Sequence, residues 1–372
     1  MKSIYLFGIS KWKQDRIKHF FPEENLIFLD KDSSSFDKKS VSKIVIWGKK
    51  SFPEAIKRAK ELNIPILFAE DGFIRSISLG LDFAQSYSLV LDSKGIYFDT
   101  STPNDLEDIL NTHKFSKKLL KRAKRVKEFL VKNRLSKYNL YRDREFEIDT
   151  SEYKKSILVV GQVEDDASII YGADGMKNLE LLKLVKFSNP NSYIIYKPHP
   201  DTISGKRKGK IPKKIALKYA NRVEKRVSID SLLDIVDEVH TITSLVGLEA
   251  LIRGKKVITY GTPFYAGWGL TEDKRPIKRK RRNLTLLELI AGAYILYPKY
   301  ISPKTLKPCE VEEVLRELKA QKELYHSSLK YRLEVNIKNF LYKKYFAVER
   351  NLNEISNFFK AVKRRVQKLF ES

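Results

Sequence analysis

The chain has 372 residues, of which 42% are hydrophobic and 11% aromatic, and its formal net charge is +26. This length has room for about two domains with buried cores, and the apolar content excludes a chain that is disordered throughout. The single cysteine, Cys309, excludes an internal disulfide bond and a cysteine-based zinc site.

The first third of the chain alternates short apolar runs with helical stretches. Strands are predicted where the apolar runs fall, over residues 4–8, 26–29, 44–47 and 65–69. Helices are predicted up to Phe21 and over residues 53–62, which begin with a proline. This alternation is typical of a parallel sheet, and we assign it to a domain over residues 1–114. Residues 87–98 are predicted to form a hairpin on the same domain.

A basic helix and a polar linker are expected next, over residues 115–155. Apolar residues recur there at helical spacing, at Leu119, Ala123, Val126 and Leu130. Residues 156–326 then repeat the first pattern, with strands predicted over 157–160, 193–196, 239–242 and 256–260, and helices near 178–186, 213–220, 231–236 and 244–253. The predicted fold class is therefore α/β, with two Rossmann-like doubly wound domains that face each other across a cleft.

The positive charge is concentrated in four segments. Residues 115–135, 205–214, 274–282 and 330–372 contain nine, six, seven and eleven Lys or Arg, against one, none, none and four acidic residues. The rest of the chain is therefore nearly neutral. Because clustered Lys and Arg are also typical of nucleic-acid-binding proteins, such a protein is kept as an alternative from a different class.

The last basic segment lies in a predicted C-terminal region of amphipathic helices, residues 327–372. Its apolar residues alternate steps of four and three, at Val348, Leu352, Ile355, Phe359, Val362, Val366 and Leu369. This spacing is typical of a helix that packs on its own domain or on a second copy. The Lys, Arg and Phe residues also fit a helix on an anionic membrane surface; the aromatics are Phe340, Phe346, Phe358 and Phe370.

Membrane-spanning and secreted classes are not expected. No apolar run approaches the roughly 20 residues that span a bilayer. The apolar stretch in residues 1–10 is too short for the core of a signal peptide, and charged residues follow it at once. We therefore expect a cytoplasmic protein.

Two acidic motifs directly follow predicted strands. Glu70 and Asp71 come after the fourth strand, where a carboxylate could act as a general base. The alternative is an acidic turn that caps the next element. Glu164, Asp165 and Asp166 come after the strand over residues 157–160, and adjacent acids fit a carboxylate nucleophile in glycosyl chemistry or a Mg²⁺ site. A helix N-cap is the structural alternative there.

Two further motifs offer groups that could bind an anion. In Lys197-Pro-His-Pro200 the prolines hold Lys197 and His199 rigidly, and these side chains suit a phosphate that becomes a leaving group. Thr243 and Ser244 precede a predicted helix whose free N–H groups favour an anion, and Glu249 is placed to accept hydrogen bonds from a ribose. The alternatives are that His199 is a structural histidine and that Glu249 is a surface acid on an amphipathic helix. The sequence has no GxGxxG motif after the first strand and no P-loop. It therefore lacks the motifs that usually indicate dinucleotide redox chemistry or ATP hydrolysis.

Five motifs, in this order, resemble a known family. They are Glu70-Asp-Gly-Phe-Ile-Arg-Ser76, Gly161-Gln-Val-Glu-Asp-Asp-Ala-Ser168, Lys197-Pro-His-Pro200, Ser244-Leu-Val-Gly-Leu-Glu-Ala250 and Pro263-Phe-Tyr-Ala-Gly-Trp-Gly-Leu270. Over about residues 1–325 the chain resembles the bacterial capsule polysaccharide biosynthesis family of β-Kdo transferases, the KpsC type. Members commonly carry two transferase modules in one chain, and this chain resembles a single module.

The resemblance implies a two-domain glycosyltransferase of GT-B-like architecture that uses CMP-Kdo, retains the anomeric configuration and needs no metal or other cofactor. It also implies a peripheral protein at the inner face of the inner membrane, acting on a lyso-phosphatidylglycerol-linked Kdo acceptor in capsule attachment and export. A second Kdo transferase or the capsule export machinery is implied as a partner, and nucleic acid is not. A transferase that uses another nucleotide sugar for a different surface glycan, such as O-antigen, is the alternative.

The resemblance also implies roles for individual residues. Asp166 is the expected nucleophile of a double displacement, with Asp165 as its main competitor and Glu164 third. Glu70 is the expected base for the acceptor hydroxyl, with Asp71 next. The residues expected to bind the donor are Lys197, His199 and Ser244 at the phosphate, Glu249 at the ribose, and Gln162, Thr243 and Gly247 in the same motifs.

Overall fold

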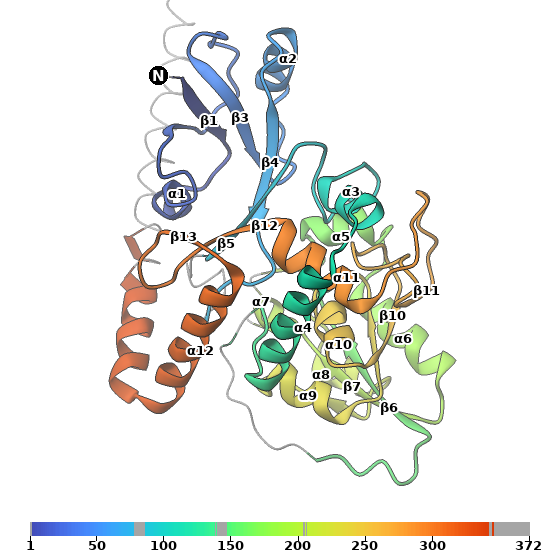
Figure 1. Ribbon diagram of the computed structural model, residues 1–372. Coiled ribbons are helices and arrows are strands. Elements are labelled where there is room, and N and C mark those ends of the chain that lie inside the picture. Colours follow the sequence, from blue (N-terminus) through green and yellow to red (C-terminus); the bar gives the residue numbers. More distant parts are fainter. Residues whose placement is uncertain are drawn as a thin grey trace, which may run out of the picture.

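The computed structural model describes residues 2–77, 86–137, 139, 147–203, 205, 207–341 and 344–345. It contains two units, each built on its own sheet, and the larger unit lies below the smaller one in the view of Figure 1. The predicted α/β class with two sheets is confirmed. None of the helices described is long and apolar enough to cross a membrane.

The first sheet has four parallel strands that agree with the predicted ones. They are β1 (Ser3–Phe7), β2 (Asn25–Leu29), β3 (Val41–Trp47) and β4 (Ile66–Asp71), in the order β2-β1-β3-β4. The predicted helices are α1 (Lys11–Lys18) and α2 (Pro53–Glu61), and Pro53 stands at the first turn of α2, where its missing N–H has no cost. Apolar side chains on both faces of the strands are buried, as a parallel sheet covered by helices requires.

The predicted hairpin over residues 87–98 is wrong. Only β5 (Ser88–Asp92) is a strand, and it pairs antiparallel with β4 and with β12 (Pro298–Ile301). The Asp92 carboxylate accepts hydrogen bonds from the N–H groups of Lys94, Gly95 and Asp105, at 3.0, 2.8 and 2.9 Å. These bonds turn the chain away from the sheet before a return strand can form.

The chain returns to the first sheet near its C-terminal end. β12 and β13 (Pro308–Cys309) complete the order β13-β12-β5-β4-β3-β1-β2. Both strands lie within residues 156–326, which we expected to belong to the second domain alone. The two units are therefore connected by more than the linker around residues 115–155.

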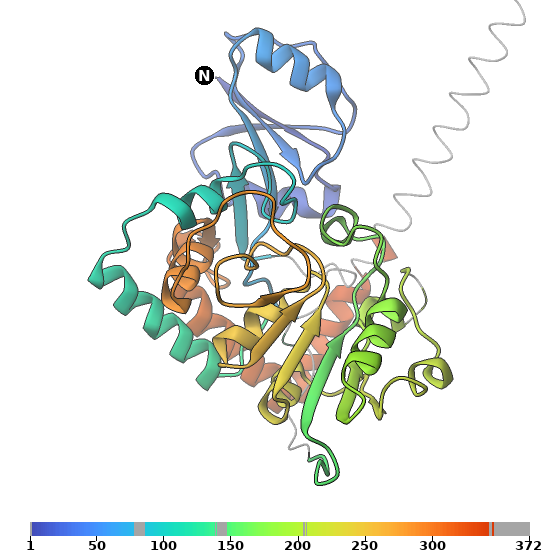
Figure 2. The same cartoon turned by 90° about the vertical axis from the view of Figure 1, so that its right-hand side faces the viewer.

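The predicted basic helix is α4 (Lys117–Lys132), capped by Ser116 and preceded by α3 (Asp105–Thr112). Ala123, Val126 and Leu130 are buried at helical spacing, while the Lys and Arg residues lie mostly on the other face. In Figure 2 α4 lies beside the orange helical segment made of α11 (Leu286–Ile290) and the π-helix η2 (Ala291–Leu296). One continuous apolar core runs from these helices into both units.

The second sheet is parallel and has the order β11-β10-β9-β6-β7-β8. Its strands are β6 (Lys155–Val160), β7 (Ser192–Lys197), β8 (Arg222–Val223), β9 (Glu238–Thr241), β10 (Lys256–Thr259) and β11 (Glu272–Asp273). Its helices are α5 (Ala167–Gly172), α6 (Asn178–Ser188), α7 (Pro200–Ile203), α8 (Lys213–Ala216), α9 (Ile229–Ile235) and α10 (Val246–Ile252). The predicted strands are confirmed, whereas β8, β11, α5 and α7 were not expected.

The second sheet is covered on both faces. Successive residues of β6 point to opposite faces of the sheet. Leu158 and Val160 lie on the face covered by α9 and α10. Ile157 and Val159 lie on the face covered by α5, α6 and α8. The strand order reverses between β6 and β9. In a doubly wound sheet the loops after those two strands separate, which opens a crevice for a ligand at their carboxyl ends.

A pair of helices follows the last strand. α12 (Val311–Ser327) buries apolar residues against the first sheet and α4, and a helix over residues 329–341 runs back beside it (Figure 1). Tyr331 and Val335 of the second helix pack on the core. The opposite side of that helix exposes a stripe of large apolar residues: Leu329, Leu333, Ile337, Phe340 and Leu341. The predicted apolar seam over residues 348–369 lies outside the described residues.

Candidate active site

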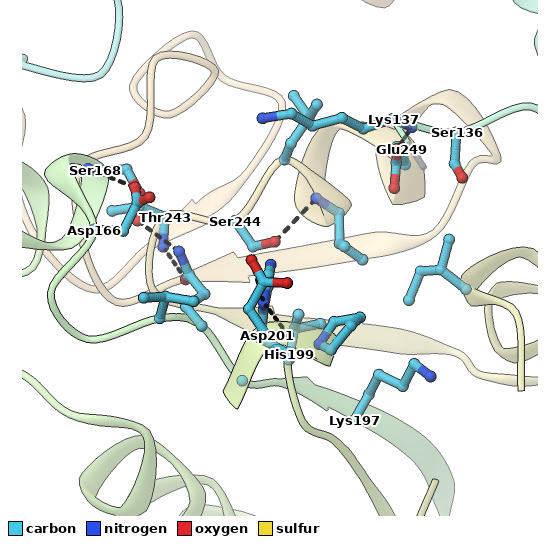
Figure 3. A pocket seen from close by; sticks show the side chains of 18 of the residues that line it. Ser136, Lys137, Asp166, Ser168, Lys197, His199, Asp201, Thr243, Ser244 and Glu249 are labelled. Atoms are coloured by element: carbon cyan, nitrogen blue, oxygen red, sulfur yellow. Dashed lines mark hydrogen bonds and ion pairs between the residues drawn. The ribbon is translucent and has the colours of Figure 1, made fainter. Parts of the chain in front are cut away.

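A cavity of about 320 Å³ lies where the two units meet. The first unit contributes the end of β4 and the aromatic residues Phe73 and Phe98, and the second unit contributes the loops after β6, β7, β9 and β10. In Figure 3 Asp166 and Ser168 lie at one end of this cavity, and Glu249 lies at the other end beside Lys137. The crevice expected from the strand order is thus the place where the polar motifs meet.

Most of the site residues predicted from the sequence line this cavity. They are Glu70, Gln162, Asp166, Lys197, His199, Thr243, Ser244 and Glu249. The carboxyl ends of neighbouring parallel strands meet at one edge of a sheet, which brings together residues that are up to 87 positions apart in the second unit. Asp71, Asp165 and Gly247 do not line the cavity.

Each of these three residues has a structural role that explains its position. Asp71 accepts hydrogen bonds from Lys13 at 3.0 Å and Arg75 at 2.9 Å, and these cations hold the pKa of its carboxyl well below the usual range, although burial opposes them. Asp165 is exposed and pairs with Arg207 at 3.1 Å. A Cβ on Gly247 would lie 2.2 Å from the Tyr265 hydroxyl oxygen, so glycine allows α10 to pack closely there.

Asp166 is the N-cap of α5. Its Oδ1 accepts hydrogen bonds from the Ser168 N–H at 3.1 Å and from the Ser168 hydroxyl at 2.9 Å. The helix-cap alternative for this residue is thereby observed, and it leaves the second carboxylate oxygen available at the cavity. Glu164 has a different role, because its Oε1 accepts the N–H of Asn178, the first residue of α6, at 2.9 Å.

The acidic run is balanced by a basic loop that packs against it. Besides the ion pair between Arg207 and Asp165, the Glu164 N–H donates to the Lys208 carbonyl at 3.1 Å. Asn178 joins both loops, since its Nδ2 donates to the carbonyls of Gln162 and Gly209 at 2.7 and 2.9 Å. Part of the basic segment over residues 205–214 therefore offsets repulsion among neighbouring carboxylates.

Glu70 is a half-buried carboxylic acid at the end of β4. Its Oε1 accepts the Asp71 N–H at 2.9 Å. Loss of hydration raises the pKa of Glu70 above its usual value, and the charge of Lys13 opposes this rise. A raised pKa makes this carboxylate a stronger proton acceptor, as a general base requires.

Lys197 is buried and His199 is half-buried, and the two side chains make different contacts. The Lys197 ammonium donates to the carbonyls of Lys225 at 3.1 Å and Val227 at 2.8 Å, and burial lowers its pKa to about 8. His199 Nδ1 accepts the Asp201 N–H at 3.2 Å. Burial lowers the pKa of His199 to about 4, with a further contribution from Lys137. At neutral pH the ring is therefore neutral and carries its proton on Nε2, as a donor.

Gln162 connects the loops after β6 and β9. Its Oε1 accepts the Thr243 N–H at 2.8 Å, and its Nε2 donates to the Thr243 hydroxyl at 3.0 Å. Ser244 Oγ accepts the N–H of Val246, the first residue of α10, at 3.2 Å. These bonds hold Thr243 and Ser244 in place at the strand-order reversal.

Glu249 lies in a buried charged cluster. Loss of hydration, with the nearby Asp230, raises the pKa of Glu249 to about 7, although the Lys137 N–H donates to its carboxylate at 2.8 Å. Asp230 is ion-paired with Arg253 beside it. Glu249 is therefore not the surface acid of the alternative interpretation, and it titrates near neutral pH.

Several cavity residues were not predicted. Ser136 and Lys137 come from the segment that we interpreted as a linker, and no local pattern distinguishes them from its other polar residues. Phe73 stacks on Phe264 with ring centroids 4.6 Å apart, which joins two of the quoted motifs across the units. Within the described ranges, no three His, Cys, Asp or Glu side chains are grouped as a metal ion would need.

Comparisons with known proteins agree on one family. A family model described as "Capsule polysaccharide biosynthesis protein" matches residues 42–300. Capsule polysaccharide modification protein LipA of Neisseria meningitidis serogroup A is 44% identical over 327 residues, which are 86% of this chain and 46% of LipA. The chain thus spans about half the length of LipA. Lipopolysaccharide-processing protein LpsZ of Rhizobium meliloti is 37% identical over 328 residues, which are 86% of this chain and 74% of LpsZ.

Two solved structures have the same fold, and both are of KpsC from Thermosulfurimonas dismutans. The β-Kdo 2,4 transferase is 32% identical, with a TM-score of 0.72, and the match covers 85% of this chain and 98% of that chain. The β-Kdo 2,7 transferase is 37% identical, with a TM-score of 0.67, and the match covers 86% of this chain and 100% of that chain. The two-sheet α/β architecture is therefore shared almost throughout with both structures.

Proposed function

The chain belongs to the capsule polysaccharide biosynthesis protein family, and on that premise we propose that it is a retaining β-Kdo glycosyltransferase. Its donor is CMP-Kdo, and its acceptor is a lipid-linked chain that ends in Kdo. The observation that carries this proposal is that Glu70 and Asp166, from different units, line one cavity together with Lys197 and His199. In the GT-B-like enzyme that we propose, the acceptor binds to the first unit and the donor to the second.

The donor side of the proposal uses the loops after β7 and β9. The neutral His199 donates from Nε2 to the phosphate of CMP, and Ser244 adds its hydroxyl. Lys197, at the end of β7, donates to two main-chain carbonyls of the segment between β8 and α9 and contributes positive charge near the leaving group. Glu249, at the opposite end of the cavity from Asp166, accepts hydrogen bonds from the ribose hydroxyls.

The proposed reaction has two displacements. In the first, the free oxygen of Asp166 bonds to the anomeric carbon of Kdo, the bond from that carbon to the phosphate oxygen breaks, and CMP leaves with the electron pair. In the second, an acceptor hydroxyl attacks the same carbon, its proton passes to Glu70, and the Asp166 carboxylate is released. Two inversions restore the original anomeric configuration. No metal ion takes part in either step.

We propose a peripheral position on the inner membrane. The exposed apolar stripe of the helix over residues 329–341 has Lys330, Arg332 and Lys338 on the same helix. An apolar stripe with neighbouring cations suits the boundary of an anionic bilayer. A lyso-phosphatidylglycerol-linked acceptor would lie in that bilayer, and a second Kdo transferase or the export machinery would meet the product there.

The experiment that tests the proposal is a donor comparison with purified protein. The chain is incubated with a Kdo-terminated acceptor and either CMP-Kdo, CMP-sialic acid or a UDP-sugar, and nucleotide release is measured with and without EDTA. We expect CMP-Kdo to be the only one of these donors that releases its nucleotide, and we expect EDTA to leave the rate of release unchanged. NMR of the product reads its linkage and anomeric configuration, and an inverted product or transfer from a UDP-sugar would contradict the proposal.

A further inference from the structure

A second hollow, of about 590 Å³, lies on the first unit beside α2 and is separate from the cavity described above. Its apolar lining is formed by Phe52, Ile56 and Phe68. Four lysines line it as well: Lys49, Lys50, Lys57 and Lys60. None of its lining residues is acidic, so this lysine groove suits a ligand with several negative charges and some apolar surface.

The lysine groove and the cavity have no lining residue in common, but they lie close together near Glu70, which lines the cavity. Phe68 and Glu70 are two residues apart on β4, so their side chains lie on one face of the sheet, about 7 Å apart along the strand. Gly48, at a φ of +60°, turns the chain at the end of β3, and a Cβ there would lie 3.5 Å from Glu70 Oε2 and 4.0 Å from the Phe98 ring. The next residue, Lys49, already lines the groove.

The four lysines are not equivalent. Lys49 is ion-paired with Asp99, and Lys50 donates to a main-chain carbonyl. Lys57 and Lys60 lie one turn apart on α2 and are exposed. Across the described part of the chain, their ammonium groups have no hydrogen-bond or ion-pair partner. These two cations are therefore the ones available to an anionic ligand.

We propose that the lysine groove binds the acidic sugars of the acceptor that lie beyond the sugar whose hydroxyl reacts. The inference rests on the proposed function, since an acceptor built of Kdo carries one carboxylate on every sugar. Glu70 takes the proton of the terminal hydroxyl, while Lys57 and Lys60 pair with carboxylates further along the chain. The ring faces of those sugars pack on Phe52 and Phe68.

Binding of a lipid-free Kdo trisaccharide to the full chain tests the groove. Isothermal titration calorimetry compares the unmodified chain with the Lys57→Gln/Lys60→Gln variant. We expect the affinity to fall about fivefold, because exposed charge pairs contribute modestly, and to depend less on salt. The control variant, Lys118→Gln/Lys121→Gln, removes the same charge at the same spacing from exposed positions of α4. Equal losses in both variants, or none in the groove variant, would overturn the proposal.

Two further arms separate the groove from the proposed function. A Kdo monosaccharide acceptor reaches only Glu70, so both variants should transfer to it as the unmodified chain does. Failure of the unmodified chain to transfer Kdo at all contradicts the proposed function, whereas unchanged trisaccharide binding by the groove variant contradicts only the groove. Micelles of lyso-phosphatidylglycerol without sugar are the last probe. A groove variant that loses binding to these micelles but keeps binding to the trisaccharide would show that the groove binds lipid phosphate and that the sugar assignment is wrong.

Discussion

Both hydrogen bonds that Asp166 accepts from Ser168 end on the same carboxylate oxygen, Oδ1. Among the described residues, no donor reaches the other oxygen, Oδ2. One residue thus caps α5 with one oxygen and presents the second one at the cavity. Because asparagine caps a helix about as well as aspartate does, the structural and chemical roles can be separated by substitution.

The Asp166→Asn variant should lose Kdo transfer by at least about 1,000-fold, because an amide is a very weak nucleophile. Its free energy of unfolding should change by less than about 0.5 kcal/mol, since the cap is kept. CMP release and urea denaturation measure the two quantities. Asp165→Asn is the matched control, because Asp165 lies outside the cavity and should be dispensable for transfer. Near-normal transfer by Asp166→Asn would remove Asp166 as the nucleophile.

The Glu70→Gln variant should lose transfer by about 100- to 10,000-fold, because glutamine cannot take the acceptor proton. Glu70 must be deprotonated to act, and its pKa is raised by burial. In the unmodified chain, kcat/KM should therefore fall with decreasing pH at a value above the usual 4.5 of a glutamate. The pH profile of kcat/KM checks both points. If the residual kcat/KM of Glu70→Gln fell at the same low pH as that of the unmodified chain, the fall would be due to another group.

His199 should make stability depend on pH in a defined window. Its pKa is about 4 in the folded chain and 6.5 for an exposed histidine, so folding favours the neutral form. The contribution of His199 to the free energy of unfolding is therefore fully present above about pH 6.5. It is lost as the pH falls toward 4, because the unfolded chain binds the proton more readily. Urea denaturation at pH 7, 6 and 5 should therefore show a smaller loss of stability in His199→Gln than in the unmodified chain. His113→Gln, at an exposed histidine, is the control, and an identical pH dependence in all three proteins would contradict the prediction.

The Leu333→Ser/Ile337→Ser variant should bind anionic vesicles at least about tenfold more weakly, because two apolar side chains no longer enter the bilayer boundary. Both residues are close to half exposed in the structure, at 50% and 56%. Vesicle flotation measures the binding, and a chain that ends at residue 327 should behave like the variant or worse. Leu184→Ser/Phe187→Ser removes a comparable exposed apolar pair from α6 and should have no effect. Equal flotation of all these proteins would exclude a membrane role for this helix.

The parallel strands and the convergence of the polar motifs could be predicted from the sequence. β4, β6 and β7 contain short apolar runs between helical stretches, and parallel strands place the residues at their carboxyl ends along one edge of each sheet. Glu70 lies at the end of β4, and Asp166 and His199 lie in the loops after β6 and β7, so their meeting in a cavity follows from topology.

Contacts between distant parts of the chain could not be predicted in the same way. The pairing of β12 with β5 joins residues about 210 positions apart, and no local periodicity encodes it. The composition of residues 274–282 shows only a basic segment, yet Arg279 and Arg281 pair with the buried Glu107 of α3. Lys137 likewise reaches Glu249 only because the chain folds back over α10.

The central claim is that Asp166 forms a covalent bond to Kdo, and intact mass spectrometry after incubation with CMP-Kdo alone tests it most directly. We expect CMP release and a gain of one Kdo residue per chain, most abundant in Glu70→Gln, where the second displacement is blocked. Peptide mapping should locate the sugar on Asp166. Transfer by the unmodified chain with no adduct in either protein, or an adduct on another residue, would contradict the account.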